Sequence, residues 1–207
     1  VSADPEDKDP IDILVDHNEL YAAAQTATNF GKVEHMEDEG FVRFYTNASG
    51  ESYFKAFSSS IETGHYLVLK YRMPKDNPSK VSTFEFYTST TEQGASGSNS
   101  FWSSGTLITD GEWHVLVINL ALRGNATYVP SSDGKYYAKF LRLDLFNQKL
   151  NEGTYIDLEY VGMSNSLDEI KELNTDMQVI QLSEEKSSFK EVSVSGEDIT
   201  VEYIKDG

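Results

Sequence analysis

Apolar and polar residues alternate in short segments along most of this chain. Successive side chains of a β-strand point to opposite faces, so this alternation, rich in β-branched and aromatic residues, predicts half-buried strands. The segments that show it are GFVRFYT, YFKAFSS, HYLVLKYRM, STFEFYTS, EWHVLVINLA, YYAKFLRLDLF and TYIDLEYVGM. Stretches rich in Gly, Pro, Asn, Asp and Ser separate them and predict turns. The pattern therefore predicts an all-β fold, an antiparallel β-sandwich.

Helical turns are expected at two places only. The segment NELYAAAQTATNF suits one or two turns, with Asn18 as N-cap and Gly31 beyond the end. The segment SNSLDEIKEL predicts a short helix capped by Ser166, with Glu169 three residues later.

The chain divides into three parts by composition. Residues 1–10 are polar and predict a linker, so we expect a piece of a longer protein. Residues 11–173 hold the strand pattern and predict the sandwich module. Residues 174–207 alternate again after a soft boundary near Asn174, and predict extra strands or the start of a following module.

The two faces of a strand can be read separately. In YYAKFLRLDLF, one face carries Leu141, Leu143 and Leu145 and predicts core, while the other carries Phe140, Arg142, Asp144 and Phe146. In HYLVLKYRM, one face carries Leu67, Leu69, Tyr71 and Met73, and the other Tyr66, Val68, Lys70 and Arg72. A face that mixes charges with aromatic rings suits a polar ligand. The alternative is an Arg–Asp ion pair whose stems pack on neighbouring rings.

Composition narrows the classes of partner. The chain has 207 residues, of which 39% are hydrophobic, and 17 basic against 34 acidic residues give a net charge of −17. Such acidity argues against nucleic acid and anionic membranes as partners. There is no cysteine, which excludes disulfides, a thiolate nucleophile and cysteine-ligated zinc. No apolar stretch approaches the roughly 20 residues of a membrane span.

Motifs for catalysis are missing. The sequence has no Gly-rich phosphate loop, no H-E-x-x-H and no G-x-S-x-G. His17, His35, His65 and His114 are scattered without metal-ligand spacing, and we expect structural roles for them. No carboxylate pair stands out for glycoside hydrolysis, so the sequence predicts a protein that is not an enzyme.

Two loops carry aromatic residues that could meet a ligand. In SGSNSFWSSG, Phe101 and Trp102 lie among small polar residues, and they either stack on a sugar or plug one end of the core. Trp113 starts an apolar strand, and we expect it to pack in the core. The second loop, RGNATYVPSSDGKYY, offers Arg123, Asn125, Tyr128 and Tyr136 as further ligand-binding candidates.

The segments DGEWHVLVINLA, YYAKFLRLDLFN and YIDLEYVGMSNSLDEI together resemble a known family. They are similar to the jelly-roll, galactose-binding-like modules of large secreted surface proteins and carbohydrate-active enzymes of gut Firmicutes. The likeness covers about residues 11–172. It implies a non-catalytic carbohydrate-binding module of a larger secreted or cell-surface protein, with a glycan and the adjacent domains as partners. One fold hosts many functions, so the site itself has to carry the function.

The resemblance also implies a structural Ca²⁺. The YID segment looks like that of carbohydrate-binding jelly rolls, whose Asp is often a calcium ligand, which nominates Asp157. Glu34, Glu37 and Asp38 in VEHMEDEG are the candidate partners, because Ca²⁺ takes six to eight oxygen ligands. The alternative is an ordinary solvated acidic turn.

Three functions from different classes remain open at this point. The first is weak binding of carbohydrate by aromatic residues in the loops or on the concave sheet. The second is a protein-interaction or spacer domain, in which Trp102 is a plug and the strands after Asn174 dock the next module. The third is a weaker alternative, an enzyme domain, which would need two carboxylates that converge in a cleft.

Overall fold

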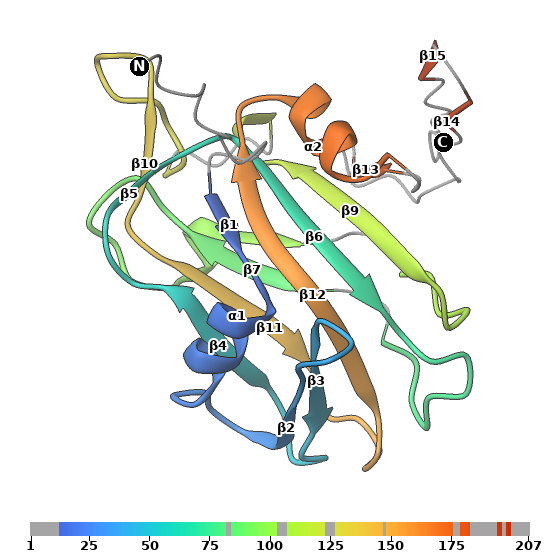
Figure 1. Cartoon of the computed structure of the whole chain (residues 1–207). Helices are drawn as coiled ribbons and strands as arrows, with labels where there is room; N and C mark the ends of the chain where they lie inside the picture. Colours follow the sequence, from blue (N-terminus) through green and yellow to red (C-terminus); the bar gives the residue numbers. More distant parts are fainter. Residues whose placement is uncertain are drawn as a thin grey trace, which may run out of the picture.

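Two antiparallel β-sheets pack face to face around one apolar core (Figure 1). The computed structural model describes residues 13–81, 84–102, 107–122, 127–146, 148–175, 179–182, 194–195 and 198–199. For Trp102, Leu122 and the residues from 179 on, the backbone alone is described. The larger sheet has the strand order β13-β9-β6-β12-β3-β2, with β1 pairing β12, and the smaller sheet has the order β4-β11-β7-β8.

The strands of the larger sheet are β1 (Ile13–Val15), β2 (Phe30–Met36), β3 (Phe41–Thr46), β6 (Tyr66–Arg72), β9 (Trp113–Asn119), β12 (Tyr155–Ser164) and β13 (Val179–Leu182). Those of the smaller sheet are β4 (Ser52–Phe57), β7 (Glu85–Thr88), β8 (Ser100–Trp102) and β11 (Leu141–Phe146). Two short pairs are β5 (Ile61–Thr63) with β10 (Tyr136–Ala138), and β14 (Val194–Ser195) with β15 (Asp198–Ile199). The helices are α1 (His17–Ala24), α2 (Leu167–Leu173) and the 3-10 turns η1 (Gly97–Asn99) and η2 (Leu120–Leu122).

The prediction of an all-β antiparallel sandwich with short helices is confirmed. Leu141, Leu143 and Leu145 of the smaller sheet are buried against the core face of the larger one, as their alternation predicts. On β6 the core face carries Leu67, Leu69 and Tyr71, and Met73 follows directly after the strand; all four are buried. Phe146 departs from the alternation, because a register shift between Asp144 and Phe146 turns its ring into the core.

Helix α1 begins at a different residue from the one the sequence suggests. The N-cap is Asp16, not Asn18, because Asp16 and Glu19 form a capping box. The Glu19 amide donates to Oδ1 of Asp16 (3.0 Å), and the Asp16 amide donates to Glu19 Oε2 (3.3 Å). The helix buries Leu20 and Ala24 in the core cluster, and packs against strands of both sheets.

Helix α2 covers part of the outer face of the larger sheet (Figure 1). Its predicted cap is confirmed, since the Ser166 hydroxyl accepts a hydrogen bond from the Glu169 amide (3.3 Å). Ile170 packs in a second apolar cluster with outward-facing residues of β6, β9 and β12, namely Val68, Val115, Val117 and Tyr160. This cover explains why β9 is apolar on both of its faces.

The structure describes only some of the residues at the two ends of the chain, where a linker and extra strands were predicted. Strand β13 pairs in parallel with β9, and so extends the larger sheet. The expected linker at residues 1–10 lies outside the described residues, and the boundary near Asn174 stays a prediction. In the part of the chain that the structure describes, no helix has both the length and the apolarity to span a membrane.

Gly64 lies where backbone segments cross tightly, and this gives a prediction for stability. A Cβ atom at Gly64 would lie 1.9 Å from the carbonyl carbon of Ser164, whereas one at exposed Gly94 would meet nothing within 4 Å. We expect Gly64→Ala to lower the free energy of unfolding by about 3 kcal/mol, because rigid backbone would have to move. Gly94→Ala should change it by less than about 0.5 kcal/mol. Urea denaturation measures both, and equal stabilities of the two variants would contradict this packing.

Candidate functional site

The outer face of the larger sheet has two unlike halves. Helix α2 covers the apolar half. The other half carries charged and aromatic side chains at the outward positions of five strands, and we call it the ring–arginine face. Its members are Lys32 and Glu34 on β2, Phe41, Arg43 and Tyr45 on β3, Tyr155, Asp157 and Glu159 on β12, Lys70 and Arg72 on β6, and Trp113 on β9.

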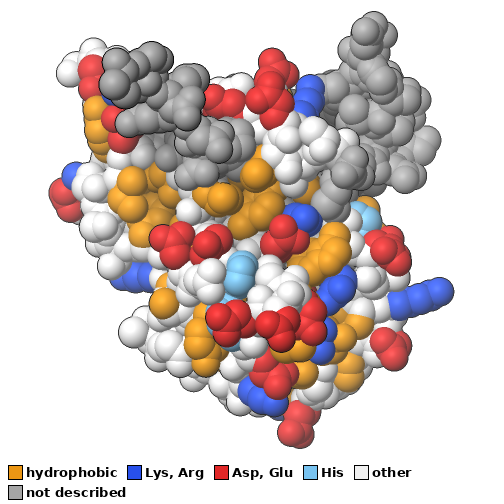
Figure 2. Space-filling model, viewed as in Figure 1, with side chains coloured by type: hydrophobic (Ala, Val, Ile, Leu, Met, Phe, Trp, Pro, Cys, Tyr) orange, Lys and Arg blue, Asp and Glu red, His pale blue; other side chains and the backbone are white. Residues whose placement is uncertain are grey.

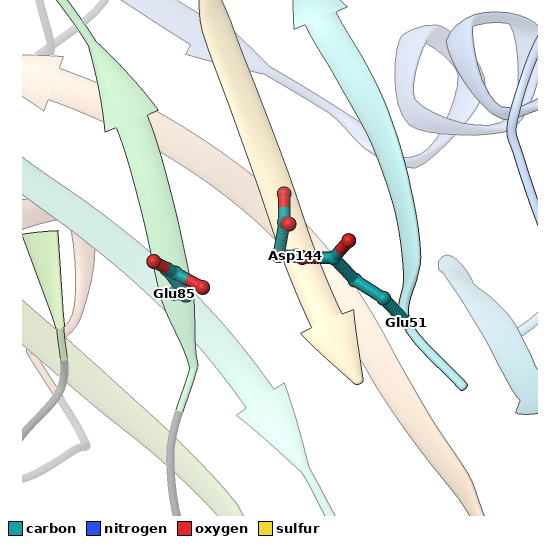
Figure 3. Close-up of side chains that lie close together, drawn as sticks. All are labelled: Glu51, Glu85 and Asp144. Carbon is teal, nitrogen blue, oxygen red and sulfur yellow. The ribbon is translucent and has the colours of Figure 1, made fainter. Parts of the chain in front are cut away.

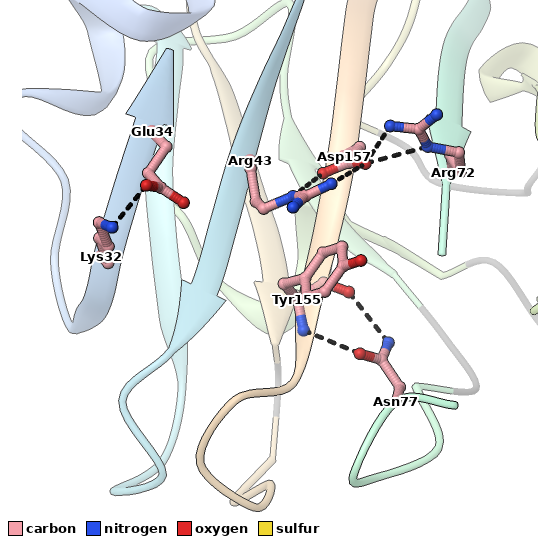
Figure 4. Close-up of polar contacts among 7 residues, drawn as sticks. All are labelled: Lys32, Glu34, Arg43, Arg72, Asn77, Tyr155 and Asp157. Atoms are coloured by element: carbon pink, nitrogen blue, oxygen red, sulfur yellow. Dashed lines mark hydrogen bonds and ion pairs between the residues drawn. The ribbon is translucent and has the colours of Figure 1, made fainter. Parts of the chain in front are cut away.

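Asp157 lies at the centre of this face, between two arginines (Figure 4). Arg43 donates from Nε to Oδ1 (2.7 Å) and from Nη2 to Oδ2 (3.0 Å). Arg72 donates from Nε (3.0 Å) and Nη2 (2.7 Å) to Oδ2. The sheet register produces this contact, because Asp157 is directly opposite Arg43 on one side and Arg72 on the other. One buried carboxylate therefore joins three neighbouring strands.

The electrostatics follow from this geometry. The Asp157 side chain is 1% exposed, whereas those of Arg43 and Arg72 are 21% and 27% exposed. Hydrogen bonding to Asp157 is the main reason that the pKa of Arg43 is raised above its already high value. Two cations thus surround a single buried anion. The exposed parts of both guanidinium groups face outward.

Aromatic rings flank both guanidinium groups. The Arg43 Cζ atom lies 4.0 Å from the centre of the Tyr155 ring, and the Arg72 Cζ atom lies 4.6 Å from that of Trp113. Phe41 lies between the two arginines, 5.7 Å and 4.8 Å from their Cζ atoms. These distances are in the range of cation–π contacts. Each guanidinium group therefore lies beside two rings. Arg43 contacts Tyr155 and Phe41, and Arg72 contacts Phe41 and Trp113.

The rings differ in how much surface they offer. Phe41 is 5% exposed and packs edge-on against Trp113 (5.6 Å between centroids), so it supports the face from below. Trp113, Tyr155 and Tyr45 are each partly exposed. Tyr45 and Tyr155 lie 5.4 Å apart on adjacent strands. The accessible surface is thus formed by one indole and two phenol rings.

A neighbouring loop fixes the start of β12. The Asn77 side chain donates to the Tyr155 carbonyl (2.9 Å) and accepts from the Tyr155 amide (3.1 Å), like one more strand residue (Figure 4). The Ser79 amide donates to Thr154 Oγ1 (3.1 Å). These bonds fix the backbone of Tyr155 at the edge of the ring–arginine face.

The smaller sheet presents a second charged and aromatic face. Arg142 donates from Nε (2.8 Å) and Nη2 (2.6 Å) to the two carboxylate oxygens of Asp144. Its Cζ atom lies 3.5 Å from the Tyr53 ring and 4.9 Å from the Tyr87 ring. Arg142 and Asp144 therefore form an ion pair, and the guanidinium group packs between two rings. This is the alternative to ligand binding that the sequence left open. Asp144 is 0% exposed, so its oxygens are not presented to a ligand in solution.

Two further carboxylates, Glu51 and Glu85, lie close to that of Asp144 (Figure 3). Burial, opposed by Arg142 and assisted by Glu51, raises the pKa of Asp144 to about 7. Ser100 donates to Glu85 (2.6 Å), and Arg142 lies 3.6 Å from Glu51. Their oxygens are the donors that Ca²⁺ prefers, but Arg142 already occupies both oxygens of Asp144. The cluster is suited to holding a shared proton.

The aromatic residues predicted in the two loops come together in the core. Phe101 is 1% exposed and packs edge-on against Tyr128, which is 3% exposed. Tyr128 stacks on the partly buried Tyr136 (5.3 Å) and donates its hydroxyl to the Gly64 carbonyl (2.7 Å). The expectation that Phe101 and Tyr128 bind a ligand is therefore wrong, because their rings fill the space between the sheets. The Trp102 side chain, Arg123 and Asn125 lie outside the described residues.

The carboxylates predicted to bind Ca²⁺ are not brought together. Both oxygens of Asp157 accept from arginines, so a dication there would face two guanidinium charges. Glu34 pairs with Lys32 (2.5 Å), while Glu37 and Asp38 are exposed in the turn after β2. Within the described residues, these four side chains form no group with metal-ligand spacing. That assignment of ligands is wrong, and calcium binding itself stays a prediction.

Trp113 corrects a further expectation. Sequence reasoning placed it in the core, but it lies partly exposed on the ring–arginine face. Arg43, Tyr45 and Tyr155 were not singled out as ligand-binding residues either. The signal that could have found them was in the alternation, because FVRFYT, LKYR and YIDLE each place charged or aromatic residues two apart.

Each of the four histidines makes a polar contact with another side chain, as expected for structural roles. His17 Nδ1 lies 2.9 Å from His35 Nε2, His65 Nδ1 lies 3.3 Å from Asn165 Oδ1, and His114 Nε2 lies 2.9 Å from Asp110 Oδ1. In the described part of the chain, no group of three or more metal-ligating side chains includes a histidine.

Comparison with known proteins shows a distant structural likeness. No protein-family model matches the chain, and neither does any curated protein. Among solved structures, the chain is similar to CBM86, a low-affinity xylan-binding module from the xylanolytic gut symbiont Roseburia intestinalis. The two are 11% identical with a TM-score of 0.40, and the match covers 76% of this chain and 97% of that one.

The raised pKa of Asp144 predicts how stability depends on pH. The folded protein holds a proton that the unfolded chain releases near its ordinary carboxyl pKa of about 3.9. This contribution is therefore fully present below about pH 4 and is lost as the pH rises towards 7. We expect the melting temperature to fall between pH 4.5 and pH 8, and to fall less in Asp144→Asn. Parallel pH profiles for the two proteins would contradict the assignment.

The Asp157 bridge predicts a loss of stability that does not depend on calcium. Asp157→Ala would leave two guanidinium groups facing each other without their shared anion. We expect the free energy of unfolding to fall by roughly 3 kcal/mol, at the low end for a broken buried pair because both arginines are partly exposed. Chemical denaturation should give the same loss in Ca²⁺ and in chelator. A loss seen only with Ca²⁺ would restore Asp157 as a metal ligand.

Proposed function

We propose that this protein is a non-catalytic carbohydrate-binding module that binds a polysaccharide on its ring–arginine face. The observation that carries the proposal is the set of partly exposed rings of Trp113, Tyr155 and Tyr45 beside the hydrogen-bonding groups of Arg43 and Arg72. Sugars have the complementary surface. Their C–H faces pack on flat aromatic rings, and their hydroxyl groups bond to charged side chains.

The arrangement suits an extended ligand. Trp113 on β9 and Tyr155 on β12 are separated by β6, so their strands are two spacings apart, about 10 Å. A ligand that touches both rings is therefore an oligosaccharide rather than a single sugar. Because the rings stand on paired strands and rest on ordered guanidinium groups, little freedom is lost when a ligand binds.

The face of the smaller sheet supports the same function less well. Arg142 packs directly against the Tyr53 ring, and its two bonds to Asp144 turn inward to a fully buried carboxylate. Fewer of its polar groups are therefore presented to a ligand. The rings that flank Arg142 on this face are those of the partly exposed Tyr53 and Tyr87.

The biological setting is part of the proposal. We propose that the module belongs to a larger secreted or cell-surface protein, with its adjacent domains as further partners. The resemblance of the segments 110–121, 136–147 and 155–170 to modules of such proteins supports this, as does the acidic, cysteine-free composition. Calcium binding is also kept as a proposal, without an assigned set of ligands.

Single-ring variants test the proposed face. Binding to an array of plant and microbial polysaccharides would be measured first, followed by titration calorimetry with those that bind. We expect Trp113→Ala and Tyr155→Ala each to weaken binding about tenfold, since a stacked ring contributes on the order of 1–2 kcal/mol.

Tyr53→Ala is the matched control. Tyr53 is also a partly exposed tyrosine against an arginine, at 3.5 Å compared with 4.0 Å for Tyr155, but on the other sheet. We expect Tyr53→Ala to bind the polysaccharide with the same affinity as the unchanged protein. If Tyr53→Ala removes binding and Tyr155→Ala does not, the ligand lies on the smaller sheet. If the folded protein binds no polysaccharide, the protein-interaction or spacer function takes the place of this one.

A further inference from the structure

The strands of the ring–arginine face carry a small excess of cations, although the whole protein is strongly acidic. These strands contribute four cations, Lys32, Arg43, Lys70 and Arg72, against three carboxylates, Glu34, Asp157 and Glu159. The whole chain has 34 acidic and only 17 basic residues. In Figure 2, basic, acidic and apolar side chains lie side by side over the region where β3, β12 and β6 run in Figure 1. A local excess of cations against this background indicates an anionic ligand.

The Asp157 bridge concentrates that excess at one place. Lys32 is paired with Glu34, and Lys70 with Glu159 (2.7 Å), so these two pairs are neutral. Arg43 and Arg72 share a single carboxylate, which leaves one positive charge on the triad. This charge lies among rings that displace water, where its attraction for an anion is stronger than in bulk solvent.

Arg72 retains hydrogen-bonding capacity towards solvent. Asp157 takes up its Nε and Nη2 atoms, and in the described part of the chain its Nη1 atom makes no hydrogen bond. A guanidinium group can donate to a carboxylate while its other edge is held in an ion pair. Trp113, on the adjacent strand, covers one side of the same group. A sugar stacked near Trp113 would bring a ring substituent close to Arg72.

Further carboxylates lie in the turns around this face, outside its strands, and the turn after β2 contains the exposed Glu37 and Asp38. The turn before β9 contains Asp110, which is bonded to His114, and the exposed Glu112. The face of the smaller sheet has no such excess of cations, since Arg142 and Lys55 lie there with Glu51, Glu85 and Asp144. The excess is therefore a feature of the strands of the ring–arginine face.

Building on the proposed function, we infer that the ligand is an acidic polysaccharide whose uronate carboxylates bind at Arg72 and Arg43 while its sugar rings stack on Trp113 and Tyr155. A neutral polysaccharide would use the same rings and lack the charge-assisted hydrogen bonds. The triad with its net positive charge would serve as the part of the site that selects for the acid.

Carboxyl reduction of the ligand gives the direct test. Polygalacturonate, alginate and glucuronoxylan would each be compared with the same polymer after its uronic acids are reduced to neutral sugars. The reduction keeps the backbone and the stacking faces and removes the charge. We expect at least one native polymer to bind about tenfold more tightly than its reduced form, as one charge-assisted hydrogen bond suggests. This difference should shrink as salt is raised from 0.05 to 0.5 M, because salt screens exposed charges.

Two variants assign the selectivity to this face. Arg72→Gln should remove the preference for the native polymer, so that it weakens binding of the native polymer more than binding of the reduced one and the two then bind equally. Lys55→Gln, on an exposed residue of the smaller sheet, changes the net charge equally and should leave the preference intact. Thermal melting of both variants would check that they are folded.

The outcomes separate this inference from the proposed function. Equal binding of native and reduced polymers, or a preference that survives Arg72→Gln in a folded protein, overturns the inference and leaves carbohydrate binding in place. Failure of every polymer, native and reduced, together with a negative array, overturns both.

Discussion

The buried carboxylate of Asp157 is the constraint on which the outer face of the larger sheet depends. A charge with 1% exposure is costly unless it is paired, and Arg43 and Arg72 pair it from both sides. The pairing joins β3, β12 and β6 by side chains in addition to their ladder hydrogen bonds. It also holds both guanidinium planes in the positions where Tyr155, Phe41 and Trp113 can pack on them.

The same sheet has two outward surfaces because helix α2 covers only part of it. Under α2 the outward residues of β6 and β9 are valines, which pack against Ile170 and form a second small core. Beyond the helix, the same strands carry Lys70, Arg72 and Trp113. One continuous set of strands thus supports a covered apolar region and an open polar one.

Much of the fold could be predicted from the sequence. The alternation placed Leu141, Leu143 and Leu145 in the core and Lys70 and Arg72 outside it, because a half-buried strand has a strict period of two. The cap of α2 at Ser166 was predictable from local hydrogen-bonding chemistry. The site was predicted less well. Arg142 and Asp144 do lie on an outer face, but Phe101 and Tyr128 are core residues although polar loops surround them in the sequence.

The sequence by itself determined the sheet-forming segments, the identity of most core faces and the acidic character of the protein, because these depend on local periodicity and on composition. The tertiary structure alone decided which strands became neighbours. Asp157, Arg43 and Arg72 are distant in the chain, and only the register of β3, β12 and β6 brings them together. It also decided that α2 ends short of Trp113, so that an aromatic residue at the start of an apolar strand became part of an open face. Local sequence patterns predict neither result, because both depend on contacts between residues that are distant in the chain.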